Sequence, residues 1–134
     1  MKGTCVCGRV TVEISRAPEY INACNCRMCR SSGAAWGYFT GAEVNVTGET
    51  KGYRREDLDD VWLENRFCPT CATTSHYVFV EAHPRDRVGV NMRLFAQEEL
   101  EGIEVRYLDG RAVESEDDAF AVTARGRIGD GKAF

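Results

Sequence analysis

The seven cysteines of this 134-residue chain fall into three short groups, with none outside them. The groups are Cys5-Val6-Cys7, Cys24-Asn25-Cys26-Arg27-Met28-Cys29 and Cys68-Pro69-Thr70-Cys71. Spacings of two and three residues let neighbouring sulfurs reach one metal ion, as in tetrahedral zinc sites with Zn–S distances of about 2.3 Å. An odd number of cysteines cannot all pair within one chain. The pattern therefore predicts metal ligands rather than a disulfide framework.

Counting ligands narrows the prediction. Two closed sites made of cysteine alone would need eight sulfurs, and the chain has seven. Two zinc ions then imply one closed site, typical of structural zinc, and one three-cysteine site with an open position, typical of catalytic zinc. The spacing favours a closed site made from the first and last groups. The central triplet would then be the site with an open coordination position. Other pairings, and a fourth ligand from a histidine or carboxylate, stay open at this point.

Two other interpretations of the cysteines compete with a catalytic zinc. Both zinc ions can be purely structural. A redox Cys-x-x-Cys is disfavoured, because thioredoxin-like motifs sit in a βαβ pattern that this sequence lacks. The two histidines, His76 and His83, are expected to be ordinary packed or surface residues, although His76 follows the last cysteine pair closely.

The elements that must position these groups are predicted to be mainly β. Alternating apolar residues predict strands over 10–14, 34–40, 44–46, 61–67, 77–80, 88–90 and 103–107. The Asp109-Gly110 pair after the last of these predicts a hairpin. Helical turns are expected at 29–33 and 97–101. The aromatic residues Trp36, Tyr38 and Phe39 are expected to belong to the core, with a pocket wall as the alternative.

Composition fits one ordinary domain, with 43% hydrophobic and 28% charged residues. The N-terminus lacks the apolar stretch of a signal peptide and no long apolar run follows, so we expect a soluble, cytoplasmic protein without a membrane partner. The net charge of -4 disfavours nucleic-acid binding. The acidity lies in residues 96–134, which have five basic and ten acidic residues. We expect this extension to hold a partly packed strand or hairpin, and residues 114–134 to form a solvated or partly disordered tail.

Three motifs carry a resemblance to a known family. They are Gly3-Thr4-Cys5-Val6-Cys7-Gly8-Arg9-Val10, the Cys-x-Cys-x-x-Cys-Arg of residues 24–30 with Gly33, and Phe67-Cys68-Pro69-Thr70-Cys71. Over roughly residues 2–95, within a domain expected to span 1–95, the chain resembles the glutathione-dependent formaldehyde-activating enzyme (GFA) family, also called the centromere protein V domain. The resemblance implies a β-tent fold of small antiparallel sheets holding two zinc ions. It implies a structural site of Cys5, Cys7, Cys68 and Cys71, and a catalytic site of Cys24, Cys26 and Cys29.

The activity implied by the resemblance is that of a carbon–sulfur lyase, which forms or cleaves S-hydroxymethylglutathione from glutathione and formaldehyde, or a related thiol adduct. The alternative is a noncatalytic zinc-binding interaction module. Arg27 and Arg30 are candidates to bind the carboxylates of the thiol, because an arginine can hold a carboxylate with two parallel hydrogen bonds. The competing interpretation is that both arginines face solvent or offset the negative charge of the cysteine thiolates. The chain departs from the family pattern at Asn25, often a histidine, and at Ala72, usually a glycine.

Overall fold

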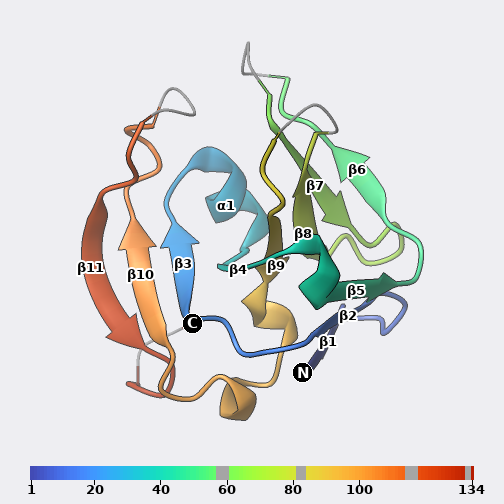
Figure 1. Cartoon of the computed structure of the whole chain (residues 1–134), viewed down its shortest axis with the longest axis horizontal. Helices are drawn as coiled ribbons and strands as arrows, with labels where there is room; N and C mark the ends of the chain where they lie inside the picture. Colours follow the sequence, from blue (N-terminus) through green and yellow to red (C-terminus); the bar gives the residue numbers. More distant parts are fainter. Residues whose placement is uncertain (57–60, 81–83, 114–117, 132–133) are drawn as a thin grey trace.

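The computed structural model describes residues 1–56, 61–80, 84–113, 118–131 and 134, and it is mainly β, as predicted (Figure 1). One sheet is three-stranded and antiparallel, in the order β1-β2-β5. Its strands are β1 (Lys2–Thr4), β2 (Thr11–Ile14) and β5 (Val44–Thr47). Val12 and Ile14 of β2 are buried and Glu13 is exposed, because successive side chains of a strand point to opposite faces.

The other sheet has eight strands, in the order β11-β10-β3-β4-β9-β8-β7-β6, and spans Figure 1 from left to right. They are β3 (Tyr20–Cys24), β4 (Trp36–Phe39), β6 (Lys51–Tyr53), β7 (Leu63–Phe67), β8 (Thr74–Phe79), β9 (Val88–Asn91), β10 (Glu104–Leu108) and β11 (Val122–Arg127). β10 runs parallel to β3, whereas the other neighbours are antiparallel. The sheet is therefore larger than the small antiparallel sheets expected, because the chain crosses back after β9 to place β10 beside β3.

Short helices connect several of the strands, and one of them, α1, carries part of the central cysteine group. The helix α1 (Arg27–Ser32) follows β3, begins after Cys26 and ends at Gly33, whose φ of 67° is left-handed. The 3-10 helix η1 (Gly41–Glu43) precedes β5, while η2 (Met92–Leu94) and η3 (Gln97–Glu99) lie in the crossover to β10. Among the described residues, no helix has the length and apolar character needed to cross a bilayer.

Most predicted elements are present within a few residues of their expected bounds, and two predictions need correction. β10 and β11 do form a hairpin, but residues 109–121 join them instead of a tight turn at Asp109-Gly110. Residues 122–127, expected to lie in a solvated or partly disordered tail, are not disordered: they form β11, which pairs with β10 along its length. β11 is mostly exposed, so backbone pairing and not an apolar pattern holds it in place.

The main core lies where the two sheets and the crossover meet. Ile21, Val90, Met92 and Leu100 are fully buried in one cluster that also includes Phe39, Val105 and Ile128. Burying each of these side chains stabilises the fold by roughly 1.5–3 kcal/mol. A second cluster, of Ala34, Trp36 and Tyr77, packs with Cys29. Phe39 thus lies in the core as expected, while Trp36 belongs to the cluster beside the cysteine triplet.

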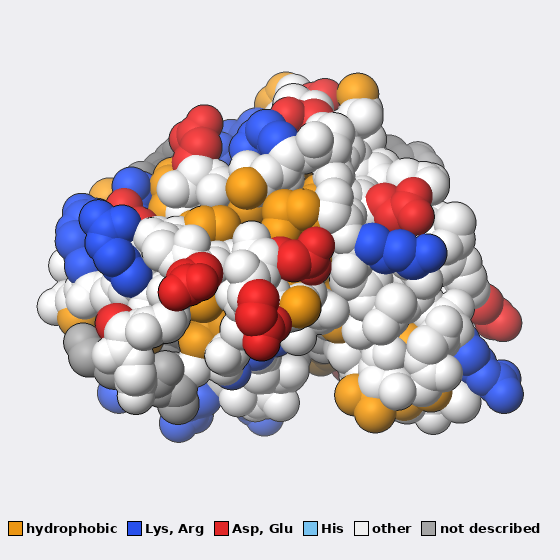
Figure 2. Space-filling view, turned by 90° about the horizontal axis from the view of Figure 1, so that it is seen from below, with side chains coloured by type: hydrophobic (Ala, Val, Ile, Leu, Met, Phe, Trp, Pro, Cys, Tyr) orange, Lys and Arg blue, Asp and Glu red, His pale blue; other side chains and the backbone are white. Residues whose placement is uncertain are grey.

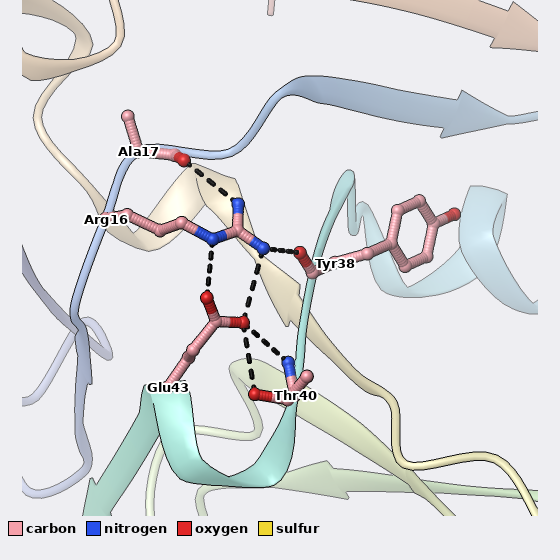
Figure 3. A network of polar contacts seen from close by, with 5 residues as sticks. All are labelled: Arg16, Ala17, Tyr38, Thr40 and Glu43. Carbon is pink, nitrogen blue, oxygen red and sulfur yellow. Dashed lines mark hydrogen bonds and ion pairs between the residues drawn. The ribbon is translucent and has the colours of Figure 1, made fainter.

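A polar network links the connection between β2 and β3 to the end of β4 and to η1 (Figure 3). The Arg16 guanidinium donates to both carboxylate oxygens of Glu43, at 2.6 and 3.2 Å, and to the backbone oxygen of Tyr38 at 3.3 Å. Glu43 also accepts from the backbone N–H and the hydroxyl of Thr40, at 2.8 and 3.2 Å. The Arg16 side chain, followed by these Thr40 donors, lowers the pKa of Glu43 to about 2. The carboxylate is therefore ionised over the neutral pH range.

Candidate metal centres and the pocket between them

Four cysteines from distant segments meet at the junction of the two sheets. The sulfurs of Cys5, Cys7, Cys68 and Cys71 all lie within 4.8 Å of one another. The Sγ atoms of Cys5 and Cys7 are 3.5 Å apart, and those of Cys7 and Cys68 are 3.7 Å apart. Four sulfurs around one tetrahedral zinc at about 2.3 Å would be about 3.8 Å apart. The cluster therefore fits a metal ion, and it joins the first and last groups as the spacing favoured.

Two similar turns present these four sulfurs. In the turn between β1 and β2, the backbone N–H of Gly8 donates to the oxygen of Cys5 over 2.9 Å. In the turn between β7 and β8, the N–H of Ala72 donates to the oxygen of Cys68 over the same distance. Ala72 has a φ of 58°, the left-handed conformation that favours glycine. An alanine therefore occupies a left-handed position where the family usually has glycine.

The central triplet forms a second cluster, which ends β3 and begins α1. The sulfurs of Cys24, Cys26 and Cys29 lie within 4.8 Å of one another, and each is half-buried. Backbone N–H groups donate to two of them: Cys26 to the sulfur of Cys24 and Cys29 to that of Cys26, each over 3.4 Å. No histidine or carboxylate from the described residues joins them. The cluster is thus able to hold a metal ion with three protein sulfurs.

Three thiolates this close together repel one another unless a cation lies between them. Hydrogen bonds from Cys24 and then Cys29 lower the pKa of Cys26 to about 2. The same neighbours, Cys24 first and Cys26 second, raise the pKa of Cys29 well above its ordinary range. One thiolate is therefore favoured at the expense of the others, because like charges this close repel one another. A bound metal ion removes that conflict, since it stabilises every ligand thiolate.

Aromatic side chains support the triplet from β4 and β8. The indole N–H of Trp36 donates to the sulfur of Cys29 over 3.1 Å. The rings of Trp36 and Tyr77 meet edge to face with centroids 5.0 Å apart, and Tyr77 meets Phe79 in the same way at 6.2 Å. Tyr77 packs directly on Gly89, where a Cβ would overlap its ring. These contacts fix the indole that holds Cys29.

Gly110 is a site residue that sequence reasoning missed. A Cβ at this position would overlap the sulfur of Cys24 and approach Cys26 Cβ to 3.1 Å. Asn25 holds the segment in place, because its Nδ2 donates to Asp109 Oδ1 over 2.9 Å and its Oδ1 accepts from the N–H of Arg111 over 3.1 Å. The Asp109-Gly110 pair was the available signal, but it indicated a turn and not contact with a cysteine 86 residues earlier. Asn25, where the family often has histidine, thus acts as a clamp on the turn after β10.

A pocket of about 800 Å³ opens over the triplet. Its wall includes the three cysteines, Trp36 and Tyr38, as well as the two arginines predicted to contact substrate, Arg27 and Arg30. Both arginines are exposed. The Tyr38 hydroxyl accepts from Asn22 Nδ2 over 2.8 Å, and burial raises its pKa to about 12. The four-cysteine cluster contributes nothing to this wall, so the two clusters differ in access as well as in ligand number.

Of the two histidines, the structure describes only His76. His76 is 7% exposed, and its Nδ1 lies 3.0 Å from the Ser75 hydroxyl. Burial, with a smaller contribution from Arg66, lowers its pKa to about 4, so the ring is neutral. It joins neither cysteine cluster, which confirms an ordinary packed position. His83 lies outside the described residues.

The comparisons with known proteins agree with these clusters. The family model described as "Glutathione-dependent formaldehyde-activating enzyme" matches residues 1–106. No curated protein shows significant sequence similarity to the chain. A crystal structure of a Rhodobacter sphaeroides protein from structural genomics is similar to the chain, with 25% identity and a TM-score of 0.60 over 77% of this chain and 97% of that chain. The family match covers most of the chain and both cysteine clusters, so the chain belongs to the glutathione-dependent formaldehyde-activating enzyme family.

Proposed function

We propose that this protein is a zinc-dependent carbon–sulfur lyase that makes or cleaves the adduct of a thiol with formaldehyde. In the forward direction the carbon–sulfur bond forms, the C=O π bond opens, and a proton passes from sulfur to oxygen. Glutathione is the thiol that the family's name suggests. One observation carries the proposal: the three-sulfur cluster lines a pocket, whereas the four-sulfur cluster does not.

The donor sets suit zinc at both clusters, because thiolate sulfur is a preferred zinc ligand. Cys5, Cys7, Cys68 and Cys71 would hold a structural ion, and Cys24, Cys26 and Cys29 a catalytic one. At the triplet, zinc would supply a positive charge that favours the ionised form of an incoming thiol. Two zinc ions per chain are the proposed cofactors.

The chain's own residues keep the triplet in one arrangement. Trp36 holds the Cys29 sulfur through its indole N–H. The missing side chain at Gly110 leaves the Cys24 sulfur undisturbed, and Asn25 holds that glycine in position. With the three sulfurs held in place, the thiol and the aldehyde would be bound next to each other at the triplet. Holding two reactants close together is a large source of rate enhancement.

The arginines of α1 supply the proposed contacts to the rest of the thiol. Arg27 and Arg30 line the pocket next to the sulfurs and carry no carboxylate partner among the described residues. Each guanidinium can bind a carboxylate through two parallel hydrogen bonds. They would orient the thiol with its sulfur toward the triplet.

Exchange NMR between formaldehyde hydrate and its thiol adduct tests the reaction directly. We expect the zinc-loaded protein to accelerate exchange above the rate in buffer, with glutathione or with neutral 2-mercaptoethanol, and Cys26→Ser to abolish the acceleration. Val6→Ser is the matched control, since Val6 is 90% exposed and supplies no sulfur. Exchange at the buffer rate with both thiols, in protein carrying two zinc ions, would contradict the proposal and favour a noncatalytic zinc-binding module.

A further inference from the structure

The proposed reaction needs a hydrogen-bond donor for the aldehyde oxygen, because that oxygen gains negative charge as the carbon–sulfur bond forms. Acidic and basic side chains are intermixed on the face seen from below in Figure 2. That face is at the end of the molecule away from the tip of β3, where Cys24 lies (Figure 1). A donor for the reacting oxygen would instead have to stand in the pocket wall beside the triplet.

Tyr38 stands on the same face of the sheet as the triplet. Successive side chains of a strand alternate between its two faces, so Tyr38 shares one face of β4 with Trp36. Asn22 shares one face of β3 with Cys24 in the same way. Asn22 and Trp36 are partners in the register of the two strands, so the two faces form one surface. All four residues line the pocket.

The ring of Tyr38 is inclined toward the triplet. By the same register Tyr38 stands opposite Tyr20, and the centroids of the two rings are 6.0 Å apart. The Tyr38 hydroxyl nevertheless accepts a hydrogen bond from Asn22 Nδ2 over 2.8 Å. Asn22 lies between Tyr20 and Cys24 on this face of β3. The hydroxyl therefore points toward the end of the strand that carries the cysteine.

Three contacts hold Tyr38 in this position. Its backbone oxygen accepts from Arg16 over 3.3 Å, and Figure 3 shows the ring pointing away from that network. Arg87 Cζ lies 5.3 Å from the centroid of the ring, and Asn22 holds the hydroxyl. A donor that is held in place before the reaction needs little reorganisation when charge develops.

The contact with Asn22 leaves the hydrogen of the Tyr38 hydroxyl available. A phenol oxygen that accepts from an amide N–H keeps its own hydrogen for another acceptor. Within the described part of the chain, no acceptor is found for that hydrogen. Burial raises the pKa of Tyr38 to about 12, so the phenol keeps its proton at neutral pH.

We propose that Tyr38 is a catalytic residue that donates a hydrogen bond, and then its proton, to the aldehyde oxygen. This inference rests on the proposed function and adds a residue to it. As the thiol sulfur attacks the carbonyl carbon, the π electron pair moves to the oxygen, which takes the proton of Tyr38. The proton released by the thiol passes to solvent, and solvent restores the phenol. Overall, one proton has moved from sulfur to oxygen.

Exchange NMR with glutathione and formaldehyde tests this on zinc-loaded Tyr38→Phe, with calorimetric binding of glutathione alone as a second readout. A positioned proton donor contributes roughly 10²–10⁴-fold to a rate, so we expect the acceleration at saturating glutathione to fall at least tenfold. Glutathione affinity should change less than twofold and zinc content should stay the same, because Tyr38 acts on the aldehyde oxygen. Tyr20→Phe is the matched control, since it removes a hydroxyl from the neighbouring ring in the same pocket and should keep the parent rate.

Asn22→Asp tests the direction of the hydrogen bond while Tyr38 stays in place. A carboxylate cannot donate, so it would accept the Tyr38 proton and withdraw it from the aldehyde. We expect the rate to fall as it does in Tyr38→Phe, and the double variant to fall no further than either single variant. A parent rate in Asn22→Asp, or a loss that persists undiminished when Tyr38→Phe is added, would overturn the inference.

The two readouts separate this inference from the proposed function. Equal acceleration by the parent and Tyr38→Phe, or equal losses in Tyr38→Phe and Tyr20→Phe, would overturn the inference and leave the proposed function intact. Glutathione affinity that falls in step with the rate would also overturn it, because Tyr38 would then have a structural role. A parent protein that carries two zinc ions and leaves exchange at the buffer rate would contradict the proposed function, and this inference with it.

Discussion

The indole nitrogen of Trp36 lies 3.1 Å from the sulfur of Cys29 and donates a hydrogen bond to it. Removing this donor with Trp36→Phe should weaken metal binding at the triplet by about tenfold or more, as is usual when a partner of a metal ligand is lost. Competition with a chelator measures the change. Trp62→Phe is the control, since Trp62 also lines the pocket but has no such bond to sulfur. Equal affinities in the two variants would show that the indole N–H plays no part.

Gly110→Ala should empty the triplet while leaving the four-cysteine cluster filled. The added methyl group would displace the Cys24 sulfur, because the space beside Gly110 is already occupied by it. Zinc content per chain should fall by one, with the fold retained by circular dichroism. Gly126→Ala in the same hairpin is the control, where the new Cβ meets the exposed Asp130 carboxylate. An unchanged zinc content in Gly110→Ala would refute this packing argument.

Ala72→Gly should stabilise the protein. Ala72 has a left-handed φ of 58°, which costs an L-residue roughly 1–2 kcal/mol, and the extra freedom of glycine when unfolded offsets about 0.5–1 kcal/mol of that. The net gain is about 0.5–1 kcal/mol, or a few degrees in Tm, measured by calorimetry with zinc present. Ala124→Gly in β11 should have the opposite sign. A lower Tm for Ala72→Gly would show that the alanine is not strained.

Ionised Glu43 stabilises the folded protein, and this stabilisation is lost at acid pH. Its pKa falls from the ordinary 4.5 to about 2 in the folded protein, through Arg16 and then Thr40. The folded state is thus favoured above pH 4.5, and this stabilisation disappears as pH falls toward 2. Glu43→Gln should be less stable than the parent at pH 7, with a difference that shrinks between pH 4.5 and 2. Thermal unfolding of both proteins at each pH tests this, with exposed Glu99→Gln as the control. A difference that does not vary with pH would contradict it.

The sequence predicted those features that depend on local pattern. The alternation of Val12 and Ile14 with Glu13 predicted their strand correctly, and the close spacing of the cysteines predicted both cysteine clusters. β11 escaped prediction because its exposed residues carry no apolar alternation, and its place comes from backbone pairing with β10. Contacts between segments that are distant in the sequence could not be predicted either. Nothing in the spacing of Gly110 or Trp36 indicates that both touch sulfurs of the triplet.

We propose that the triplet holds its own metal ion with three cysteine ligands. Zinc content per chain, measured by elemental analysis on the purified protein and on Cys26→Ser, tests it most directly. We predict two zinc ions in the parent protein and one in the variant, because the four-cysteine cluster is independent of Cys26. One zinc ion in the parent protein, or two in the variant, would contradict the account.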